Sequence, residues 1–141
     1  MENFETAAKS LSASDRILQE LIRFDTTVEL RPEKPAIDYI RMLLEKEGIE
    51  TETFCRDPKR PNLMATIKSE TGKLPPLLMY GHVDVVPVEG QEWSCEPFGA
   101  GVGDGCIWGR GALDMKGELT MFITAMIQVK RDGVSLPFDL K

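Results

Sequence analysis

Three segments of the chain have apolar residues at the spacing of one helix face, about every three or four positions. The first follows Ser14 and Asp15, which suit a helix start, and ends at residues 26–27. The second covers residues 35–47 and the third about 117–131. The apolar positions of these predicted helices are Ile17, Leu18, Leu21 and Ile22; Ile37, Ile40, Leu43 and Leu44; and Leu119, Phe122, Ile123, Met126 and Ile127.

Strands are predicted between and after these helices. Residues 49–54 alternate apolar and polar side chains, as in a half-buried edge or hairpin strand, and residues 62–68 form a second apolar segment. The continuous apolar run 77–80 predicts a strand that is buried on both faces, and residues 134–141 begin another strand. We therefore expect an α/β fold: a three-layer sandwich with a mixed, mostly parallel central sheet flanked by helices.

Residues 87–111 have a different composition, rich in Gly, Pro, Trp and acidic residues. Loops of this length inside a domain are usually functional or disordered. Within it, Asp104 stands between glycines and is interpreted as a turn residue.

Composition narrows the function classes. The 141 residues suit one domain, and the net charge of −6 argues against a nucleic-acid surface. No apolar run approaches the roughly 18 residues of a membrane span, and the start MENFETAAKS does not resemble a secretory signal. Three cysteines and one histidine do not suit a disulfide framework or a structural zinc knot, so a cytoplasmic location is expected.

The single histidine, His82, follows the predicted strand 77–80 directly after Gly81. Sites in open α/β sheets form beyond the carboxyl ends of strands, where an imidazole nitrogen can face a metal. Asp84 can accept the other ring N–H and so fix the tautomer. The alternative is a structural or surface histidine, which is more common for a lone His.

A second candidate, Asp114, lies in the segment 109–117, Gly-Arg-Gly-Ala-Leu-Asp-Met-Lys-Gly, immediately before the third predicted helix. An aspartate at such a junction commonly caps the helix, and that is the alternative interpretation. The glycines permit a tight backbone, and a carboxylate there suits bridging two cations, since zinc accepts both imidazole and carboxylate ligands.

Several motifs together resemble one family. Residues 77–87 (Leu-Leu-Met-Tyr-Gly-His-Val-Asp-Val-Val-Pro), Trp93, Pro97-Phe98, Asp104-Gly105 and 109–117 follow one another as in the zinc aminoacylase/carboxypeptidase family of metallopeptidases. That family includes acetylornithine deacetylase, succinyl-diaminopimelate desuccinylase and glutamate carboxypeptidases. The strong resemblance covers about forty residues, and the chain is expected to be the amino-terminal portion of the catalytic domain.

The resemblance implies roles for three residues. His82 is expected to ligate one of two zinc ions, and Asp114 to bridge both. Asp84 is expected to serve catalysis by orienting His82. The resemblance also makes the Asp114–Met115 peptide bond a candidate for the cis form. A zinc-activated water would then attack the amide carbonyl of a small peptide or an N-acyl amino acid, and cobalt or manganese can replace zinc.

Four other motif residues have simpler interpretations. Arg110 and Lys116 are expected to support the structure of the loop. Trp93 and Phe98 are expected to pack the long loop onto the body of the domain, the alternative being that they line the cleft.

Part of the family's machinery is missing from the sequence. In the family, adjacent acidic residues after the next strand supply the general base and a further ligand, and no Glu-Glu pair occurs here. The family's lid and dimerisation domain is also absent, and the resemblance allows dimerisation of the full-length protein. We therefore expect this chain alone to be inactive and to bind metal weakly or not at all. Both a truncated piece and a short natural gene fit this pattern.

The sequence also bears on two function classes other than an enzyme. A non-catalytic remnant of the same fold, acting as a binding or interaction module, remains the alternative to an enzyme. A nucleotide-binding module is excluded because neither a dinucleotide fingerprint nor a P-loop motif is present.

Overall fold

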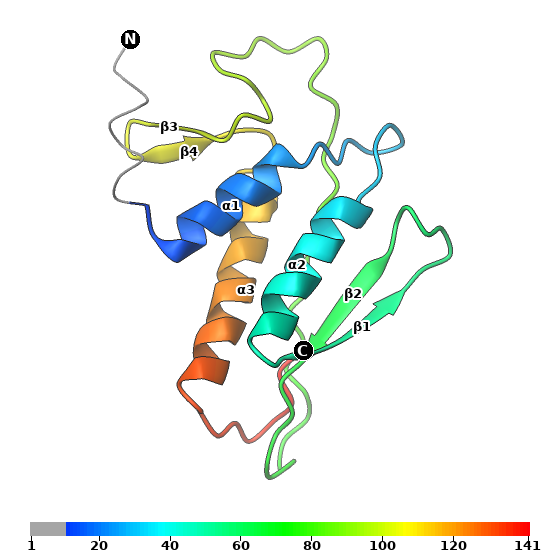
Figure 1. The fold of residues 1–141 in the computed structure, drawn as a ribbon, viewed down its shortest axis with the longest axis vertical. Coiled ribbons are helices and arrows are strands. Elements are labelled where there is room, and N and C mark those ends of the chain that lie inside the picture. The colour runs from blue at the N-terminus through cyan, green and yellow to red at the C-terminus, as the bar shows by residue number, and fades with distance from the viewer. Residues whose placement is uncertain (1–10) are drawn as a thin grey trace. The chain divides into compact units, whose positions relative to one another are not determined.

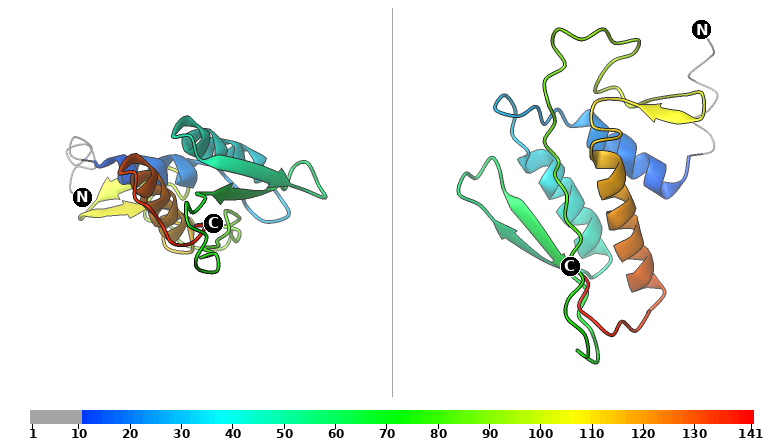
Figure 2. Two further views of the ribbon diagram at one scale, coloured as in Figure 1. Left: turned by 90° about the horizontal axis from the view of Figure 1, so that it is seen from below. Right: turned by 180° about the vertical axis from the view of Figure 1, so that it is seen from behind.

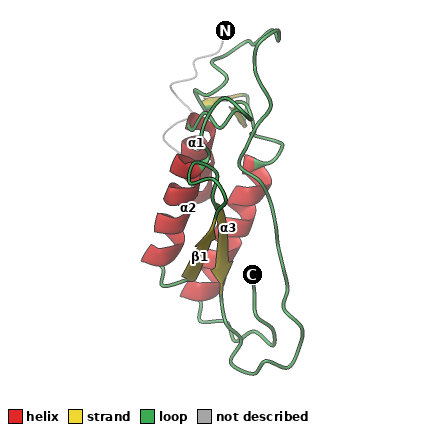
Figure 3. Cartoon of the chain, turned by 90° about the vertical axis from the view of Figure 1, so that its right-hand side faces the viewer, coloured by secondary structure: helices red, strands yellow, loops and turns green. Residues whose placement is uncertain are grey.

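The computed structural model describes residues 11–141, in which short helices and strands are joined by long loops (Figures 1 and 3). In chain order the elements are α1 (Ala13–Arg23), α2 (Lys34–Lys46), β1 (Glu50–Phe54), β2 (Asn62–Thr66), β3 (Gly101–Gly103), β4 (Cys106–Trp108) and α3 (Lys116–Arg131). They group into a first unit, residues 11–32 with 82–120, and a second unit, residues 33–81 with 121–141. The stretch MENFETAAKS, on which the expectation of no secretory signal rests, lies outside the described residues.

A capping box begins α1 in the first unit. The Ser12 hydroxyl accepts the Asp15 backbone N–H at 3.2 Å, and the Asp15 carboxylate accepts the Ser12 N–H at 2.8 Å. The expectation that Ser14 caps this helix is wrong, because Ser12 has the three-residue spacing from Asp15 that the reciprocal pair requires. One face of the helix is fully buried through Leu21 and Ile22.

The chain after α1 pairs with the segment that follows Gly81. The buried Thr26 hydroxyl donates to the Val83 carbonyl at 2.6 Å. Thr27 and Val85 form an isolated parallel bridge, in which the Val85 N–H donates to the Thr26 carbonyl at 3.1 Å. Residues 83–85 are thereby attached to the end of α1.

Part of the expected loop 87–111 is a β-hairpin. β3 and β4 pair antiparallel, and Asp104 and Gly105 connect them with φ angles of 52° and 73°. Positive φ at both central residues is typical of a type I′ turn, which favours Asp-Gly. The prediction of a turn at Asp104 is confirmed, whereas strands of three residues are too short to give a detectable alternation.

The second helix, α2, begins one residue before its predicted start and ends close to its predicted end. Its buried residues are Ala36, Ile40 and Leu44. Gly48, at φ +70°, follows the helix in the left-handed conformation that glycine adopts without strain. In Figures 1 and 2, α2 lies alongside the hairpin of β1 and β2, whose antiparallel register pairs Glu50 with Thr66 and Phe54 with Asn62. The predicted helix and hairpin strand are confirmed.

The third helix, α3, covers nearly the predicted residues 117–131. Its residues up to Thr120 belong to the first unit and the others to the second. Its buried residues in the second unit are Ile123, Met126 and Ile127. Near its end, the Arg131 guanidinium donates to both carboxylate oxygens of Glu47, at 2.6 and 2.8 Å. Gly133, at φ +61°, follows the helix.

The last residues of the chain join two segments of the second unit. Leu140 forms an antiparallel bridge with Ile67 and a parallel bridge with Leu77. The right-hand view of Figure 2 shows the C-terminus beside this part of the chain. The predicted strands 77–80 and 134–141 therefore meet, but only through these isolated bridges.

The expectation that residues 77–80 are buried on both faces is wrong. Leu78 is 63% exposed and Tyr80 is 83% exposed. A strand is buried on both faces only where layers cover both sides of its sheet, and no described element covers these two side chains.

The described residues form only part of the expected fold. Their sheets are two antiparallel pairs, β1–β2 and β3–β4, and not a mixed, mostly parallel central sheet. None of the helices within residues 11–141 is long and apolar enough to span a membrane. Cys55, Cys95 and Cys106 are free thiols.

Candidate metal centre

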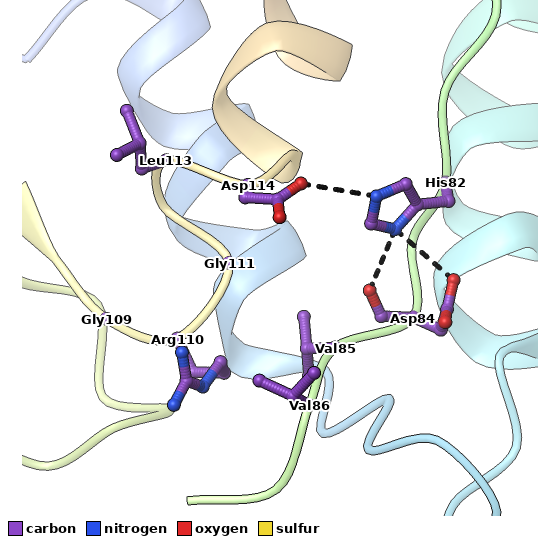
Figure 4. A pocket seen from close by; sticks show the side chains of 9 residues that line it. All are labelled: His82, Asp84, Val85, Val86, Gly109, Arg110, Gly111, Leu113 and Asp114. Atoms are coloured by element: carbon purple, nitrogen blue, oxygen red, sulfur yellow. Dashed lines mark hydrogen bonds and ion pairs between the residues drawn. The ribbon is translucent and has the colours of Figure 1, made fainter.

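The two residues expected to bind metal lie together in the first unit. The Nε2 atom of His82 is 3.3 Å from the Asp114 Oδ1 atom, and the two side chains point toward each other in Figure 4. Both are accessible to solvent: 47% of the His82 side chain and 86% of the Asp114 side chain are exposed. Residues 32 positions apart in the sequence thus form one open cluster.

Asp84 lies against the other nitrogen of the His82 ring. The His82 Nδ1 atom is 3.0 Å from the Asp84 backbone carbonyl and 3.3 Å from its carboxylate. Both atoms can accept a proton from Nδ1, which would leave Nε2 with a free lone pair directed at Asp114. The Asp84 carboxylate was the expected acceptor, whereas the Asp84 backbone carbonyl is the closer one.

The tight loop before α3 carries Asp114. The Asp114–Met115 peptide bond is cis, as expected from the resemblance. Gly117 lies so close to this loop that a Cβ atom there would be 2.3 Å from the Ala112 carbonyl oxygen. Only a residue without a side chain fits this position, which explains the glycine at the start of the helix.

Lys116 is the largest fully buried side chain among the described residues. Its ammonium group donates to the Phe24 carbonyl at 2.8 Å. Burial lowers the pKa of Lys116 to about 8, and the nearby charge of Asp25 acts in the opposite direction. The expected structural role of Lys116 agrees with this geometry, because the side chain connects the Asp114 loop to the end of α1.

Arg110 holds the loop that precedes the hairpin. Its guanidinium lies over the Trp93 ring, 5.1 Å from the ring centre, and donates to the Pro87 carbonyl at 3.3 Å and to the Gln91 side chain. This agrees with the expected supporting role of Arg110, and with the interpretation that Trp93 packs the loop.

A pocket surrounds the pair formed by His82 and Asp114. Its volume is about 280 Å³. The residues that line it are His82, Asp84, Val85, Val86, Gly109, Arg110, Gly111, Leu113 and Asp114 (Figure 4). Its only acidic residues are Asp84 and Asp114, and residues 11–141 contain no group of three His, Cys, Asp or Glu side chains placed to hold a metal ion.

The pair nevertheless fits a zinc ion in chemistry and spacing. Two ligand atoms, each about 2.0–2.1 Å from a tetrahedral zinc, lie roughly 3.3 Å apart. The Nε2–Oδ1 distance of 3.3 Å agrees with this value and exceeds the usual length of a direct N–H···O hydrogen bond. Imidazole and carboxylate are both zinc ligands, so the chain offers two donors for one ion.

Sequence reasoning missed the residues that hold the His82 segment. Thr26 and Thr27 were interpreted only as the end of a helix, yet both pair with residues 83–85. The available signal was weak: two consecutive β-branched polar residues favour extended backbone.

Comparison with known proteins identifies similar chains. The model of Peptidase family M20/M25/M40 matches residues 78–141. N-formyl-4-amino-5-aminomethyl-2-methylpyrimidine deformylase of Halalkalibacterium halodurans is 36% identical over 129 residues, which cover 88% of this chain and 30% of that protein. Succinyl-diaminopimelate desuccinylase of Wolbachia pipientis is 40% identical over 116 residues, which cover 80% of this chain and 27% of that protein.

A solved structure has a similar fold. The M20 family metallo-carboxypeptidase Sso-CP2 from Sulfolobus solfataricus superposes with a TM-score of 0.77 at 22% identity, covering 92% of this chain and 30% of that one. The chain thus spans less than a third of the length of the relatives it matches.

Proposed function

We propose that this chain, which belongs to peptidase family M20/M25/M40, contributes part of the metal centre of an enzyme that hydrolyses amide bonds. The observation that carries the proposal is the 3.3 Å approach of His82 Nε2 to Asp114 Oδ1 in an open pocket. A separation suited to two ligands of one ion supports a metal role over the alternatives of a surface histidine and a helix cap.

Each of the three residues has a distinct proposed role. His82, through Nε2, would hold one of two zinc ions, and the Asp114 carboxylate would be the ligand shared by both. Asp84 orients the His82 ring by accepting the Nδ1 proton, which its position at 3.0–3.3 Å supports. A bound zinc ion supplies Lewis acidity and a water of lowered pKa, and cobalt or manganese can supply the same chemistry.

The proposed substrate is a small peptide or an N-acyl amino acid. The relatives are named for removing a formyl group, a succinyl group or a carboxy-terminal residue. These names have in common the release of an acyl group or an amino acid, which supports an amide bond as the one cleaved.

The chain is proposed to be the amino-terminal portion of a catalytic domain. Its 27–30% share of its relatives' length supports this. The parallel bridge between Leu77 and Leu140 supports a mixed, mostly parallel sheet in the complete domain, flanked by helices as a three-layer sandwich. The free thiols suit the proposed cytoplasmic location.

The chain alone is proposed to be inactive. Hydrolysis needs a general base within reach of the attacking water. The pocket has Asp84 and Asp114 as its acidic residues, and both have other proposed roles. The alternative function is a non-catalytic module that binds a partner or a metal through the same fold.

Metal binding and turnover together test the proposal. The 141-residue chain is titrated with Zn²⁺ or Co²⁺ and then assayed with dipeptides and N-acyl amino acids. We expect weak metal binding that His82→Ala and Asp114→Ala each reduce at least about tenfold, and no turnover. Asp132→Ala, which changes an exposed aspartate of the second unit, is the control.

The outcomes separate the two functions. Equal metal binding by all variants would contradict the ligand roles, and robust turnover would contradict the inactivity of the chain. Extending the protein through the DNA downstream of codon 141 distinguishes an enzyme from a binding module. An added acidic pair that brings turnover favours the enzyme, and an extended protein that binds metal without turnover favours the module.

A further inference from the structure

We infer that the segment following α1, residues 24–27, sets the distance between His82 and Asp114 by holding both segments that carry them. Only the expected effect on metal binding rests on the proposed function, and the positioning of the two side chains does not. The positioning residues are Lys116 on the Asp114 side and Thr26 on the His82 side.

The Asp114 side is held through Lys116, two residues further along the chain. Its ammonium group donates to the Phe24 carbonyl at 2.8 Å, and the whole residue is buried. The Lys116 N–H also donates to the Gly111 carbonyl at 2.9 Å, which closes the loop around Asp114. An apolar side chain of the same length would fill this space without desolvating a charge, so what the ammonium adds is a directed bond to α1.

The His82 side is held through Thr26, which bonds to Val83, the residue directly after His82. The Thr26 hydroxyl donates to the Val83 carbonyl at 2.6 Å, and Thr26 is fully buried. The Val85 N–H donates to the Thr26 carbonyl at 3.1 Å. These bonds are on either side of Asp84, so they hold the backbone from which both His82 and Asp84 project.

Packing cannot supply this positioning, because the two side chains are open to solvent. His82 has 47% and Asp114 has 86% of its side chain exposed. A side chain that is largely open to solvent takes its position mainly from its backbone. Both backbones are bonded to residues 24–27. Lys116 donates to the Phe24 carbonyl, and Thr26 donates to the Val83 carbonyl.

Two isosteric substitutions remove one link each. Lys116→Met keeps the unbranched stem of the side chain and removes the ammonium, and it should fold because it also removes a buried charge. Thr26→Val keeps the shape and removes the hydroxyl, while Thr26→Ser restores the hydroxyl. Thr120→Val is the matched control: Thr120 is also buried, and its hydroxyl donates within α3 to the Lys116 carbonyl at 2.8 Å.

The first measurement needs no metal. His82 is the only histidine of the chain, so its ring protons are identified directly in an NMR spectrum. In the unsubstituted chain we expect nuclear Overhauser contacts between the His82 ring protons and the Asp114 Hβ protons. Lys116→Met and Thr26→Val should weaken these contacts, and Thr120→Val and Thr26→Ser should retain them. Circular dichroism establishes that each variant is folded, and Lys116→Met provides the answer if Thr26→Val does not fold.

The second measurement is a Zn²⁺ titration followed through the same ring signals. The apparent dissociation constant should rise at least about tenfold in Lys116→Met and in Thr26→Val, as for other residues that orient metal ligands. Thr26→Ser should recover most of the affinity, which loss of general stability would not explain.

Each outcome has one meaning. Ring contacts that are unchanged in both variants would overturn the inference and leave the proposed metal role standing. Contacts that weaken in a chain showing no response to Zn²⁺ would support the inference and contradict the weak Zn²⁺ binding expected of this chain. Absence of the contacts in the unsubstituted chain would overturn both.

Discussion

The backbone of Gly111 lies directly against the side chain of Lys116. A Cβ atom on Gly111 would be 3.0 Å from Lys116 Cδ and 2.9 Å from Val85 Cγ1, and the residue has φ +85°. Gly111→Ala therefore adds both backbone strain and a collision with two side chains. We expect it to lower the free energy of unfolding by about 2–4 kcal/mol in urea denaturation.

Gly72→Ala is the matched control for this substitution. Gly72 has a comparable φ of +58°, but nothing lies within 4 Å of an added Cβ atom. It should cost only the strain of about 1–2 kcal/mol. Equal losses at the two positions would show that the contact with Lys116 and Val85 is not tight.

Asp84→Asn tests how much of the His82 orientation depends on the carboxylate. The backbone carbonyl of Asp84 is 3.0 Å from Nδ1 and remains after the substitution, while the carboxylate is at 3.3 Å. We expect Zn²⁺ affinity to fall by about tenfold, at the lower end of the usual range for such neighbours of a ligand. His82→Ala should lower it further. A loss for Asp84→Asn as large as that for His82→Ala would instead favour direct ligation by Asp84.

Arg110→Lys tests the attachment of the loop that precedes the hairpin. Lysine keeps the charge but lacks the planar guanidinium that lies over the Trp93 ring. We expect faster hydrogen exchange in residues 87–99 and a red shift of Trp93 fluorescence, measured in a Trp108→Phe background. Arg41→Lys, at an exposed arginine paired with Asp38, should change neither signal.

The capping box of α1 predicts a pH dependence of stability. Hydrogen bonding with Ser12, through its side chain first and its backbone second, holds the pKa of Asp15 below its ordinary value of 3.8. The ionised form is therefore favoured in the folded state, and its contribution is complete above the unfolded pKa and lost as the pH falls through the folded pKa. The stability difference between the chain and Asp15→Asn should be present at pH 7 and diminish below pH 3.8.

Ser12→Ala provides the companion measurement. Loss of an N-cap side chain typically costs about 1 kcal/mol. Ser14→Ala should cost less, because the Ser14 hydroxyl contacts the Ser12 hydroxyl at 2.8 Å, while the capping bonds themselves join Ser12 and Asp15. A larger loss for Ser14→Ala than for Ser12→Ala would contradict the capping box.

The helices were predictable from the sequence because their burial follows a simple period. Ile40 and Leu44 in α2, like Ile123 and Ile127 in α3, are four residues apart and buried, so the apolar pattern locates the buried face. Gly48 and Gly133 mark the ends, since their positive φ angles suit glycine.

The sheet was less predictable, because strand burial depends on partners distant in the sequence. The run 77–80 has the composition of a buried strand, yet Leu78 and Tyr80 are exposed where no described element covers them. The hairpin of β3 and β4 was missed because three residues give no period, and only the Asp-Gly pair indicated it.

The pairing of His82 with Asp114 was anticipated from the motifs that contain them, and the structure brings the two side chains within 3.3 Å. Their metal-binding roles remain predictions. The roles of Thr26 and Phe24 were not predictable, because a hydroxyl that bonds to Val83 and a carbonyl that accepts from Lys116 leave no characteristic sequence pattern.

The exposed segment 77–80 has a practical consequence for handling the chain. Its backbone pairs with residues 139–141 along one edge, and no described residue pairs with the other edge. The side chains of Leu78 and Tyr80 lie open to water. An unprotected apolar strand edge promotes association between copies of a protein. Metal affinities should therefore be measured over a dilution series, since a value that changes with protein concentration would report self-association and not the pocket.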